Sequence, residues 1–330
     1  MTRVLSGIQP TGDVQLGNYV GAIRRWAAEQ YEHDALHLVV DLHALTIPRD
    51  PAELRSKTLE TATVLLACGL DPDVCTLFVQ SHVPEHPQLT WLLECTASMG
   101  ELRRMTQFKD KAAKGGEESA RVGLFTYPAL MAADILLYDI DEVPVGDDQR
   151  QHVELCRDLA ERYNTRYGQT FVVPKATFPV VGNRVMDLQN PTAKMSKSAD
   201  SDAGLILLLE PPASIARKIK RAVTDTETEV RYDPAAKPGV SNLLELLSVA
   251  TGKPPAELAS GYQQYGPLKS DTADAVVAMV EPIQQRFAEL AADPGHVHAV
   301  LAKGAAKATS VASATLDRAK RNIGLLPLDV

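Results

Sequence analysis

Residues 194–198 (KMSKS) combine two lysines and two serines in one short segment. Two ammonium groups and two hydroxyls this close together suit a clamp for a triphosphate, because such groups contribute most when charge develops on a leaving pyrophosphate. A solvated charged loop is the alternative. At roughly 5% usage per position, however, this pentapeptide would arise by chance only about once in 10,000 chains of this size. The segment therefore predicts nucleotide chemistry.

A glycine-containing turn at residues 6–18 (SGIQPTGDVQLGN) leads directly into a predicted helix. Gly12 and Gly17 have the spacing of a phosphate-binding loop, but Asn18 and Tyr19 stand where that motif requires Lys and Ser/Thr. The G-x-G-x-x-G pattern of dinucleotide-binding dehydrogenases is also missing from this turn. What remains is either a turn that presents backbone N–H groups to an anion at a helix N-terminus, or a purely structural turn.

The elements that must position these segments alternate between strand and helix in the first part of the chain. We predict strands at residues 4–8, 36–41, 76–80 and 142–145, and helices at residues 16–30, 52–68, 124–138 and 147–167. Such alternation indicates βαβ units and a doubly wound parallel sheet, a Rossmann-like α/β fold. After Pro191 the pattern changes to helices separated by Pro and Gly, ending in a long helix at residues 296–322. We therefore expect a catalytic domain at residues 1–190 and a helical domain at residues 191–330.

Composition narrows the class of protein further. The 330 residues are 45% hydrophobic, and no run approaches the roughly 18 apolar residues that a membrane span needs, so we expect a cytoplasmic protein without a membrane partner. The four cysteines are scattered without a C-x-x-C pair, so no metal site is predicted. A net charge of −8 argues against a DNA-coating protein. Any RNA contact should be local, and Arg217, Lys218, Lys220 and Arg221 form the densest basic cluster, unless this is simply a solvated helix face.

Residues 12–18 and 194–198 together resemble the HIGH-type and KMSKS signatures of class I aminoacyl-tRNA synthetases. Four further segments, at residues 6–10, 126–135, 143–153 and 222–225, are similar to bacterial tryptophanyl-tRNA synthetases in particular, and the resemblance covers essentially the whole chain. One departure is Gln15, where the family more often has Thr or His. An amide can still donate a hydrogen bond to a phosphate.

An acidic residue stands on an otherwise apolar face of the helix predicted at residues 124–138. Tyr127, Met131, Asp134 and Tyr138 fall at i, i+4, i+7 and i+11 and so share that face. A carboxylate there is costly unless a donor meets it. The indole N–H is a donor only, which suits Asp134 to reading tryptophan against phenylalanine; pairing with an internal arginine or a helix cap is the alternative. We expect the pocket walls to be Leu5, Met131, Val143 and Val145, with His43 at the border or merely structural.

The resemblance also implies contacts with ATP and with the substrate ammonium. Gly146, Asp147 and Asp148 would line the ribose, although an Asp at a strand-to-helix turn is most often an N-cap. Gln149 with Tyr127 would hold the ammonium, and Lys111 is either a further triphosphate contact or a surface lysine. The remaining implied ATP contacts are Gln9, Pro10, Thr11, Gly17, Asn18, Val185, Lys194, Met195, Ser196, Lys197 and Ser198.

The implied function is a tryptophan–tRNA ligase, which forms tryptophanyl-adenylate from L-tryptophan and ATP with Mg²⁺ and transfers tryptophan to tRNA(Trp). The resemblance further implies a homodimer and a helical anticodon-binding domain. Lys194 and Lys197, with Lys111, would be the catalytic residues. Three alternatives stay open: a tyrosyl-type synthetase, a dehydrogenase that lacks its glycine fingerprint, and an RNA-binding paralogue, which would have lost the two lysines that this chain retains.

Overall fold

The chain is built on a parallel sheet. The structure, a computed structural model, describes residues 1–105, 121–146, 149–178, 185–195 and 202–327. Five strands lie in the order β3 (Thr76–Val79), β2 (Asp34–Val39), β1 (Arg3–Ile8), β4 (Glu142–Pro144), β5 (Lys175–Thr177), all parallel. The chain starts in the middle, adds β2 and β3 on one side, and then crosses to β4 and β5 on the other. This confirms the predicted doubly wound sheet.

The buried strands β2 and β3 match the runs of apolar residues in the sequence, whereas the edge strand β5 has no such run. All four residues of β3 are buried, as are the last five of β2, which is typical of parallel strands covered on both faces. Strand β5 was not predicted, because its three residues are exposed or half-buried and include the weak strand former Lys175. Its pairing with β4 comes from the tertiary structure, because Glu142 lies opposite Lys175.

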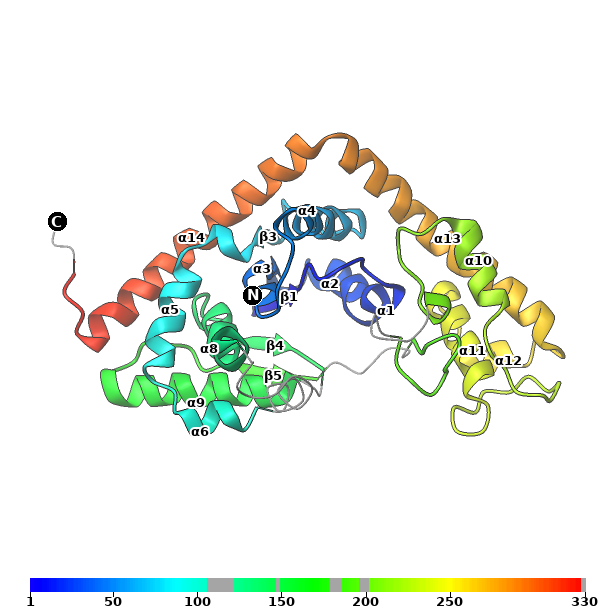
Figure 1. Ribbon diagram of the computed structural model, residues 1–330, viewed down its shortest axis with the longest axis horizontal. Helices are drawn as coiled ribbons and strands as arrows, with labels where there is room; N and C mark the ends of the chain where they lie inside the picture. The colour runs from blue at the N-terminus through cyan, green and yellow to red at the C-terminus, as the bar shows by residue number, and fades with distance from the viewer. Residues whose placement is uncertain (106–120, 147–148, 179–184, 196–201, 328–330) are drawn as a thin grey trace.

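One face of the sheet is covered by helices α5 (Glu85–Glu94), α8 (Val122–Leu136), α9 (Arg150–Tyr167) and α14 (Pro294–Ile323) (Figure 1). Leu5, Leu38 and Val143 point from neighbouring strands into the core that these helices close. Because side chains alternate along a strand, the residues on either side of them face the opposite layer. We call the helix-covered side with Leu5 the front face and the opposite side the rear face.

The rear face carries α4 (Pro51–Ala67) and a helical segment that begins after the glycine turn. A single helix was predicted at residues 16–30, but the segment divides into α1 (Leu16–Asn18), a π-helical turn η1 (Tyr19–Ile23) and α2 (Arg24–Glu29). Periodicity alone does not reveal the wider turn, which adds one residue per turn and is frequent near functional sites.

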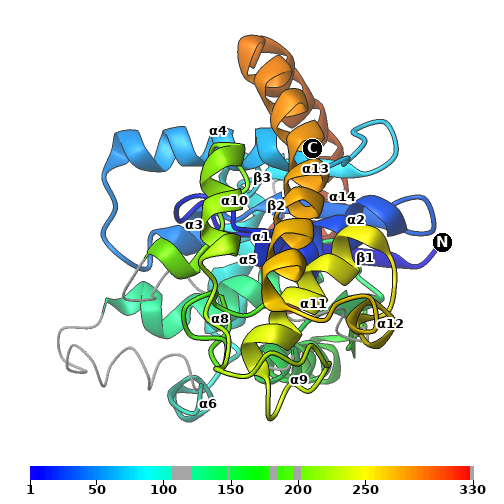
Figure 2. The same ribbon diagram turned by 90° about the vertical axis from the view of Figure 1, so that its right-hand side faces the viewer.

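The C-terminal helices form an arch over the molecule (Figures 1 and 2). Helix α13 (Tyr265–Ala292) packs against α10 (Pro212–Lys220), α11 (Pro238–Thr251) and α4. Helix α14 then returns to the sheet, where Gly304 allows close approach: a Cβ there would lie 1.9 Å from the Leu77 carbonyl oxygen. The Tyr163 hydroxyl donates to the Ala319 carbonyl at 2.9 Å. The last helix therefore packs with the first part of the chain, and the domain division at residue 190 stays a proposal.

Shorter elements complete the described ranges: α3 (Asp41–Ala44), η2 (Gln80–His82), α6 (Met99–Arg103), η5 (Asp202–Gly204) and α12 (Pro255–Ala259). Within these ranges no helix combines the length and the apolar character that crossing a bilayer would require.

Candidate active site

A cavity of about 370 Å³ opens on the front face where β1 and β4 lie side by side. This is the point at which the strand order reverses, and α/β sheets bind ligands at the carboxyl ends of strands there. All eight residues predicted for the amino-acid site line it: Leu5, His43, Tyr127, Met131, Asp134, Val143, Val145 and Gln149. Two residues predicted to contact ATP, Gln9 and Gly146, also line it.

Asp134 is buried at the inner end of this cavity and is held by three donors. His43 Nε2 lies 2.8 Å from Oδ2, while Gln80 Nε2 and His86 Nδ1 lie 2.7 Å and 2.6 Å from Oδ1. An ionised carboxylate only accepts, so each of these nitrogens carries the hydrogen. Behind them, His86 Nε2 lies 2.8 Å from the Tyr138 hydroxyl. The carboxylate is thus fixed in direction by groups from α3, η2 and α5.

These hydrogen bonds decide the charge of Asp134. Burial acts to raise the pKa of the carboxyl, but the hydrogen bonds from His43 and His86 outweigh burial and lower the pKa to about 2. The group is therefore an anion at neutral pH. A carboxylate offers about four acceptor directions, and the three donors leave one on Oδ2 for a ligand.

Asp134 and its partner His43 were predicted for this site, whereas the other two donors, Gln80 and His86, were not, and neither was His152. Gln80 and His86 stand on either side of a turn after β3, and His152, whose Nε2 lies 2.6 Å from the Tyr127 hydroxyl, is on α9. Neither an internal arginine nor a cap meets the carboxylate in the described chain. The available signal was position: Gln80 is the last residue of a predicted strand, and the carboxyl ends of parallel strands share one edge.

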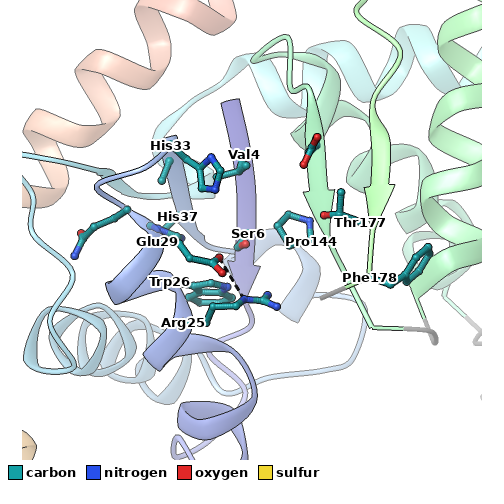
Figure 3. A pocket seen from close by; sticks show the side chains of 13 residues that line it. Val4, Ser6, Arg25, Trp26, Glu29, His33, His37, Pro144, Thr177 and Phe178 are labelled. Atoms are coloured by element: carbon teal, nitrogen blue, oxygen red, sulfur yellow. Dashed lines mark ion pairs between the residues drawn. The ribbon is translucent and has the colours of Figure 1, made fainter. Parts of the chain in front are cut away.

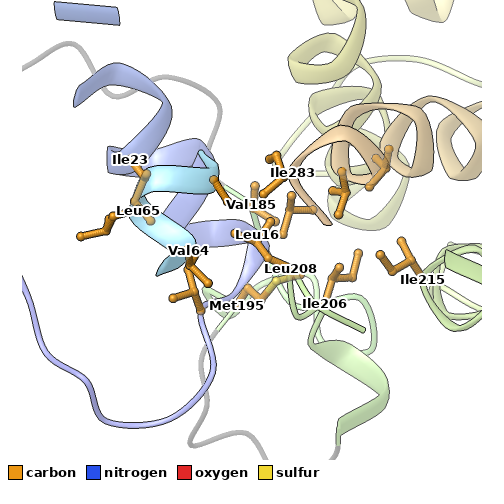
Figure 4. Packing of buried hydrophobic residues seen from close by; sticks show 14 of the residues in the cluster. Leu16, Ile23, Val64, Leu65, Val185, Met195, Ile206, Leu208, Ile215 and Ile283 are labelled. Atoms are coloured by element: carbon orange, nitrogen blue, oxygen red, sulfur yellow. The ribbon is translucent and has the colours of Figure 1, made fainter. Parts of the chain in front are cut away.

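The segments predicted to bind the nucleotide are far apart in sequence and meet in the structure. Gln15 pairs with Leu207 in an isolated bridge, and the Leu16 N–H donates to the Ile206 carbonyl at 2.9 Å. The Gln15 side chain donates to the Met195 carbonyl at 3.4 Å. Buried Leu16, Val185 and Met195 pack together at this junction with Ile206 and Leu208 (Figure 4).

The structure thus brings part of the predicted ATP set together. Gly17 and Asn18 begin the helical segment directly behind Gln15, and Met186 pairs with Lys194 in a second isolated bridge. Gln9, Pro10 and Thr11 lie in the turn between β1 and this segment, where Gly12 has φ of 104° and so needs glycine. Six predicted residues lie outside the described ranges: Lys111, Asp147, Asp148, Ser196, Lys197 and Ser198.

The basic cluster on α10 is smaller than predicted. Lys218 Nζ donates to Glu210 Oε2 at 2.6 Å and to the Leu205 carbonyl at 2.7 Å, so this ammonium stabilises the fold. The RNA contact predicted for this cluster stays a prediction, and Lys218 would have to break these bonds to take part in it. Arg217, Lys220 and Arg221 remain exposed.

A doubly wound sheet with a switch-point cavity, next to a junction of the two signature segments, defines a class I aminoacyl-tRNA synthetase architecture. The sequence matches the family model described as "tRNA synthetases class I (W and Y)" over residues 1–281. The chain belongs to this family, within the tryptophan–tRNA ligases of bacterial type.

Individual relatives align with this chain over nearly its whole length. The chain is 58% identical to Tryptophan--tRNA ligase 1 of Streptomyces coelicolor, over 99% of this chain and 98% of that protein. It is 54% identical to Tryptophan--tRNA ligase of Mycobacterium leprae, over 99% and 97%. Among solved structures, tryptophanyl-tRNA synthetase from Mycoplasma pneumoniae superposes with a TM-score of 0.89 at 36% identity, over 99% and 98% of the two chains. The Campylobacter jejuni enzyme complexed with ADP and tryptophan gives 0.86 at 34% identity, over 98% and 100%.

Proposed function

We propose that this chain activates L-tryptophan with ATP and transfers it to tRNA(Trp), and that the buried Asp134 carboxylate selects the amino acid. The observation that carries the proposal is the remaining acceptor direction of a fixed, ionised carboxylate at the inner end of an apolar cavity. An indole N–H satisfies that acceptor, whereas a phenyl ring would leave a buried charge without its last partner. Leu5, Met131, Val143 and Val145 would pack around the indole.

The polar mouth of the cavity suits the α-amino and carboxylate groups of the substrate. Gln149 and Tyr127 would orient the ammonium, and Tyr127 is itself aligned by His152. Gln9 and Gly146, which line the same cavity, lead toward the nucleotide end. Tryptophan bound in this direction would present its carboxylate to the α-phosphate of ATP.

The first reaction forms a bond between a carboxylate oxygen of tryptophan and the α-phosphorus. The bond from that phosphorus to the bridging oxygen breaks, and pyrophosphate leaves with the electron pair. Lys194 and Lys197, with Lys111, would stabilise the charge on the departing group, because the reaction depends on positioning and electrostatics. A ribose hydroxyl of the tRNA then attacks the acyl carbon, and AMP leaves.

Contacts along ATP are assigned by the family resemblance together with the observed junction. Gly146, Asp147 and Asp148 would hold the ribose, and the turn with the KMSKS segment would hold the phosphates. The residues proposed for these contacts are Gln9, Pro10, Thr11, Gly17, Asn18, Val185, Lys194, Met195, Ser196, Lys197 and Ser198.

We propose that magnesium is bound at this site together with the nucleotide. In the described ranges no three His, Cys, Asp or Glu side chains lie close enough to hold a metal ion. Mg²⁺ is usually held by phosphate oxygens and water in nucleotide enzymes, where it neutralises phosphate charge. We therefore propose Mg²⁺ as a companion of ATP and assign it no protein cage.

The location of the enzyme, its contact with tRNA and its oligomeric state are also proposals. We place the enzyme in the cytoplasm, with the helices after residue 190 contacting the anticodon and two copies forming a homodimer. Exposed Trp91, Met99 and Val122, at 65%, 62% and 76% exposure, supply apolar surface for a second copy. Sedimentation equilibrium of the full chain and of Val122→Asp tests the dimer.

Amino-acid-dependent exchange of ATP with labelled pyrophosphate, run with each of the twenty amino acids, tests the substrate. Tryptophan alone should support rapid exchange; rapid exchange with tyrosine instead would replace this proposal by the tyrosyl alternative. Single-turnover kinetics of Lys197→Ala test the catalytic lysine. The activation free energy of adenylation should rise by about 3–4 kcal/mol, so that the rate constant of this step falls. The rate of transfer from preformed adenylate should change much less.

A further inference from the structure

The first lysine of the KMSKS segment lies in a short antiparallel hairpin, in which Lys194 is opposite Met186. We call residues 185–195 the lysine hairpin. Its backbone hydrogen bonds are made by the neighbours of this pair. They run from the Asp187 N–H to the Ala193 carbonyl, at 2.9 Å, and from the Met195 N–H to the Val185 carbonyl, at 3.3 Å.

This pattern of bonds turns the backbone of Met186 away from Lys194. In an antiparallel ladder, opposite residues alternate between pairs that exchange hydrogen bonds and pairs that do not. Met186 and Lys194 form a pair of the second kind, because their neighbours make the bonds. The Met186 N–H and carbonyl therefore point to the outer side of the hairpin, where they need partners from another element.

Asn242 of α11 supplies both partners. Its Oδ1 accepts from the Met186 N–H at 2.9 Å, and its Nδ2 donates to the Met186 carbonyl at 3.0 Å. The side-chain amide thus takes the place of a third strand. Asn242 is 3% exposed, so removing its amide would leave two backbone groups without partners at a site that water hardly reaches.

Helix α11 is itself tied to the helical segment that follows the glycine turn. Arg24 Nη1 on α2 donates to the Val249 carbonyl, near the end of α11, at 2.7 Å. At the first turn of α11, a Cβ on Gly239 would lie 2.1 Å from the Val223 carbonyl oxygen, so the helix fits closely against the chain there. Both ends of α11 are therefore held, and Asn242 carries this fixed placement to the lysine hairpin.

We propose that Asn242 is a positioning residue for Lys194, acting through the backbone of the lysine hairpin without touching the substrate. The inference rests on the proposed role of Lys194 at the departing pyrophosphate. A charge stabiliser must be held in place before the reaction, and a displacement of about 1 Å can cost on the order of a hundredfold in rate. The helical part of the chain thus contributes to adenylation as well as to the proposed tRNA contact.

Single-turnover adenylation by the full chain tests this role. Asn242→Ala should lower the rate constant about tenfold or more. The ATP concentration at half-maximal rate should stay within about threefold, because Lys194 acts mainly in the transition state. Asn242→Asp keeps the volume and the acceptor but loses the donor to the Met186 carbonyl. It should also slow adenylation, and it keeps the test open if Asn242→Ala does not fold.

Asn164 on α9 provides a matched control. Its amide makes the same kind of contact, accepting from the Thr170 and Phe171 N–H groups at 2.9 Å and 2.8 Å and donating to the Phe171 carbonyl at 2.8 Å. Phe171 belongs to the core on the front face, whereas the lysine hairpin packs in the other core. Asn164→Ala should lower the urea midpoint, as Asn242→Ala does, but leave adenylation within about twofold of wild type. Equal rate losses in the two variants would overturn the proposal.

A double variant tests whether Asn242 acts through Lys194. Lys194→Ala combined with Asn242→Ala should be no slower than Lys194→Ala alone, because no ammonium is left to position. Losses that multiply would overturn the proposal, and so would normal adenylation by Asn242→Ala and Asn242→Asp while Lys194→Ala is slow. Normal adenylation by Lys194→Ala would instead refute the proposed role of Lys194, and this inference with it.

Discussion

Asp134 on the front face of the sheet and His37 on the rear face (Figure 3) are both buried ionisable side chains, and their surroundings are opposite. On the front face Asp134 accepts hydrogen bonds from His43, Gln80 and His86. On the rear face His37 has no partner for either nitrogen among the described residues. The pKa of Asp134 is lowered to about 2 by its donors despite burial, whereas burial alone lowers the pKa of His37 to about 4.

The difference shows that burial does not determine charge; partners do. With donors in place, a buried group keeps its charge and can direct that charge at a substrate. Without them it stays neutral and offers only dipoles. The cavity beside Asp134, which we call the front cavity, is therefore suited to select a donor such as indole N–H.

Removing a donor from Asp134 should give the largest effect. His86→Leu leaves the buried anion short of a partner and should lower the free energy of unfolding by about 3 kcal/mol. His86→Asn keeps an N–H group near the position of Nδ1 and should lose only about 1 kcal/mol. Urea denaturation at pH 7 measures both. A loss below 1 kcal/mol in His86→Leu would show that the front and rear groups do not differ as described.

His37 should give a pH dependence of intermediate size. Its folded pKa, about 4, lies below the ordinary 6.5, so the unfolded chain binds the proton more readily between these values. Stability from keeping the ring neutral is complete above pH 6.5 and falls as the pH drops toward 4. The wild type should lose about 2 kcal/mol more than His37→Phe between pH 7 and pH 5. Parallel pH profiles of the two proteins would contradict a neutral buried His37.

The smallest effect is expected at Tyr138, which bonds to His86 and not to the Asp134 carboxylate itself. Tyr138→Phe removes the hydroxyl that meets His86 Nε2 and should cost about 1 kcal/mol of stability. Because Tyr138 does not line the front cavity, the KM for tryptophan should stay within about twofold. A tenfold rise in KM would mean that the outer hydrogen bond also positions Asp134 for the substrate.

Much of the front cavity followed from sequence because it depends on local periodicity. Tyr127, Met131 and Asp134 share a face of one helix, and Val143 and Val145 alternate along one predicted strand. The βαβ alternation implied a parallel sheet with a point at which the strand order reverses. These features need no knowledge of which distant segments meet.

The rest depends on contacts between distant segments. Gln80 and His86 reach Asp134 only because β3 pairs beside β2, with Leu36 opposite Thr76. The π turn η1 and the short edge strand β5 have no local signature of comparable strength. Lys218 looked like a surface cation until the fold placed Glu210 against it. The unpartnered state of His37 likewise follows from the three-dimensional arrangement of α2 and the strands.

The central claim is that the Asp134 carboxylate reads the indole N–H. The most direct measurement compares kcat/KM in pyrophosphate exchange for tryptophan and for 3-(benzothiophen-3-yl)alanine, in which sulfur replaces that N–H. Wild type should prefer tryptophan by roughly 10- to 150-fold, the worth of a charge-assisted hydrogen bond of about 1.5–3 kcal/mol. In Asp134→Asn this preference should shrink at least fivefold. An unchanged preference in the variant would contradict the assignment of Asp134.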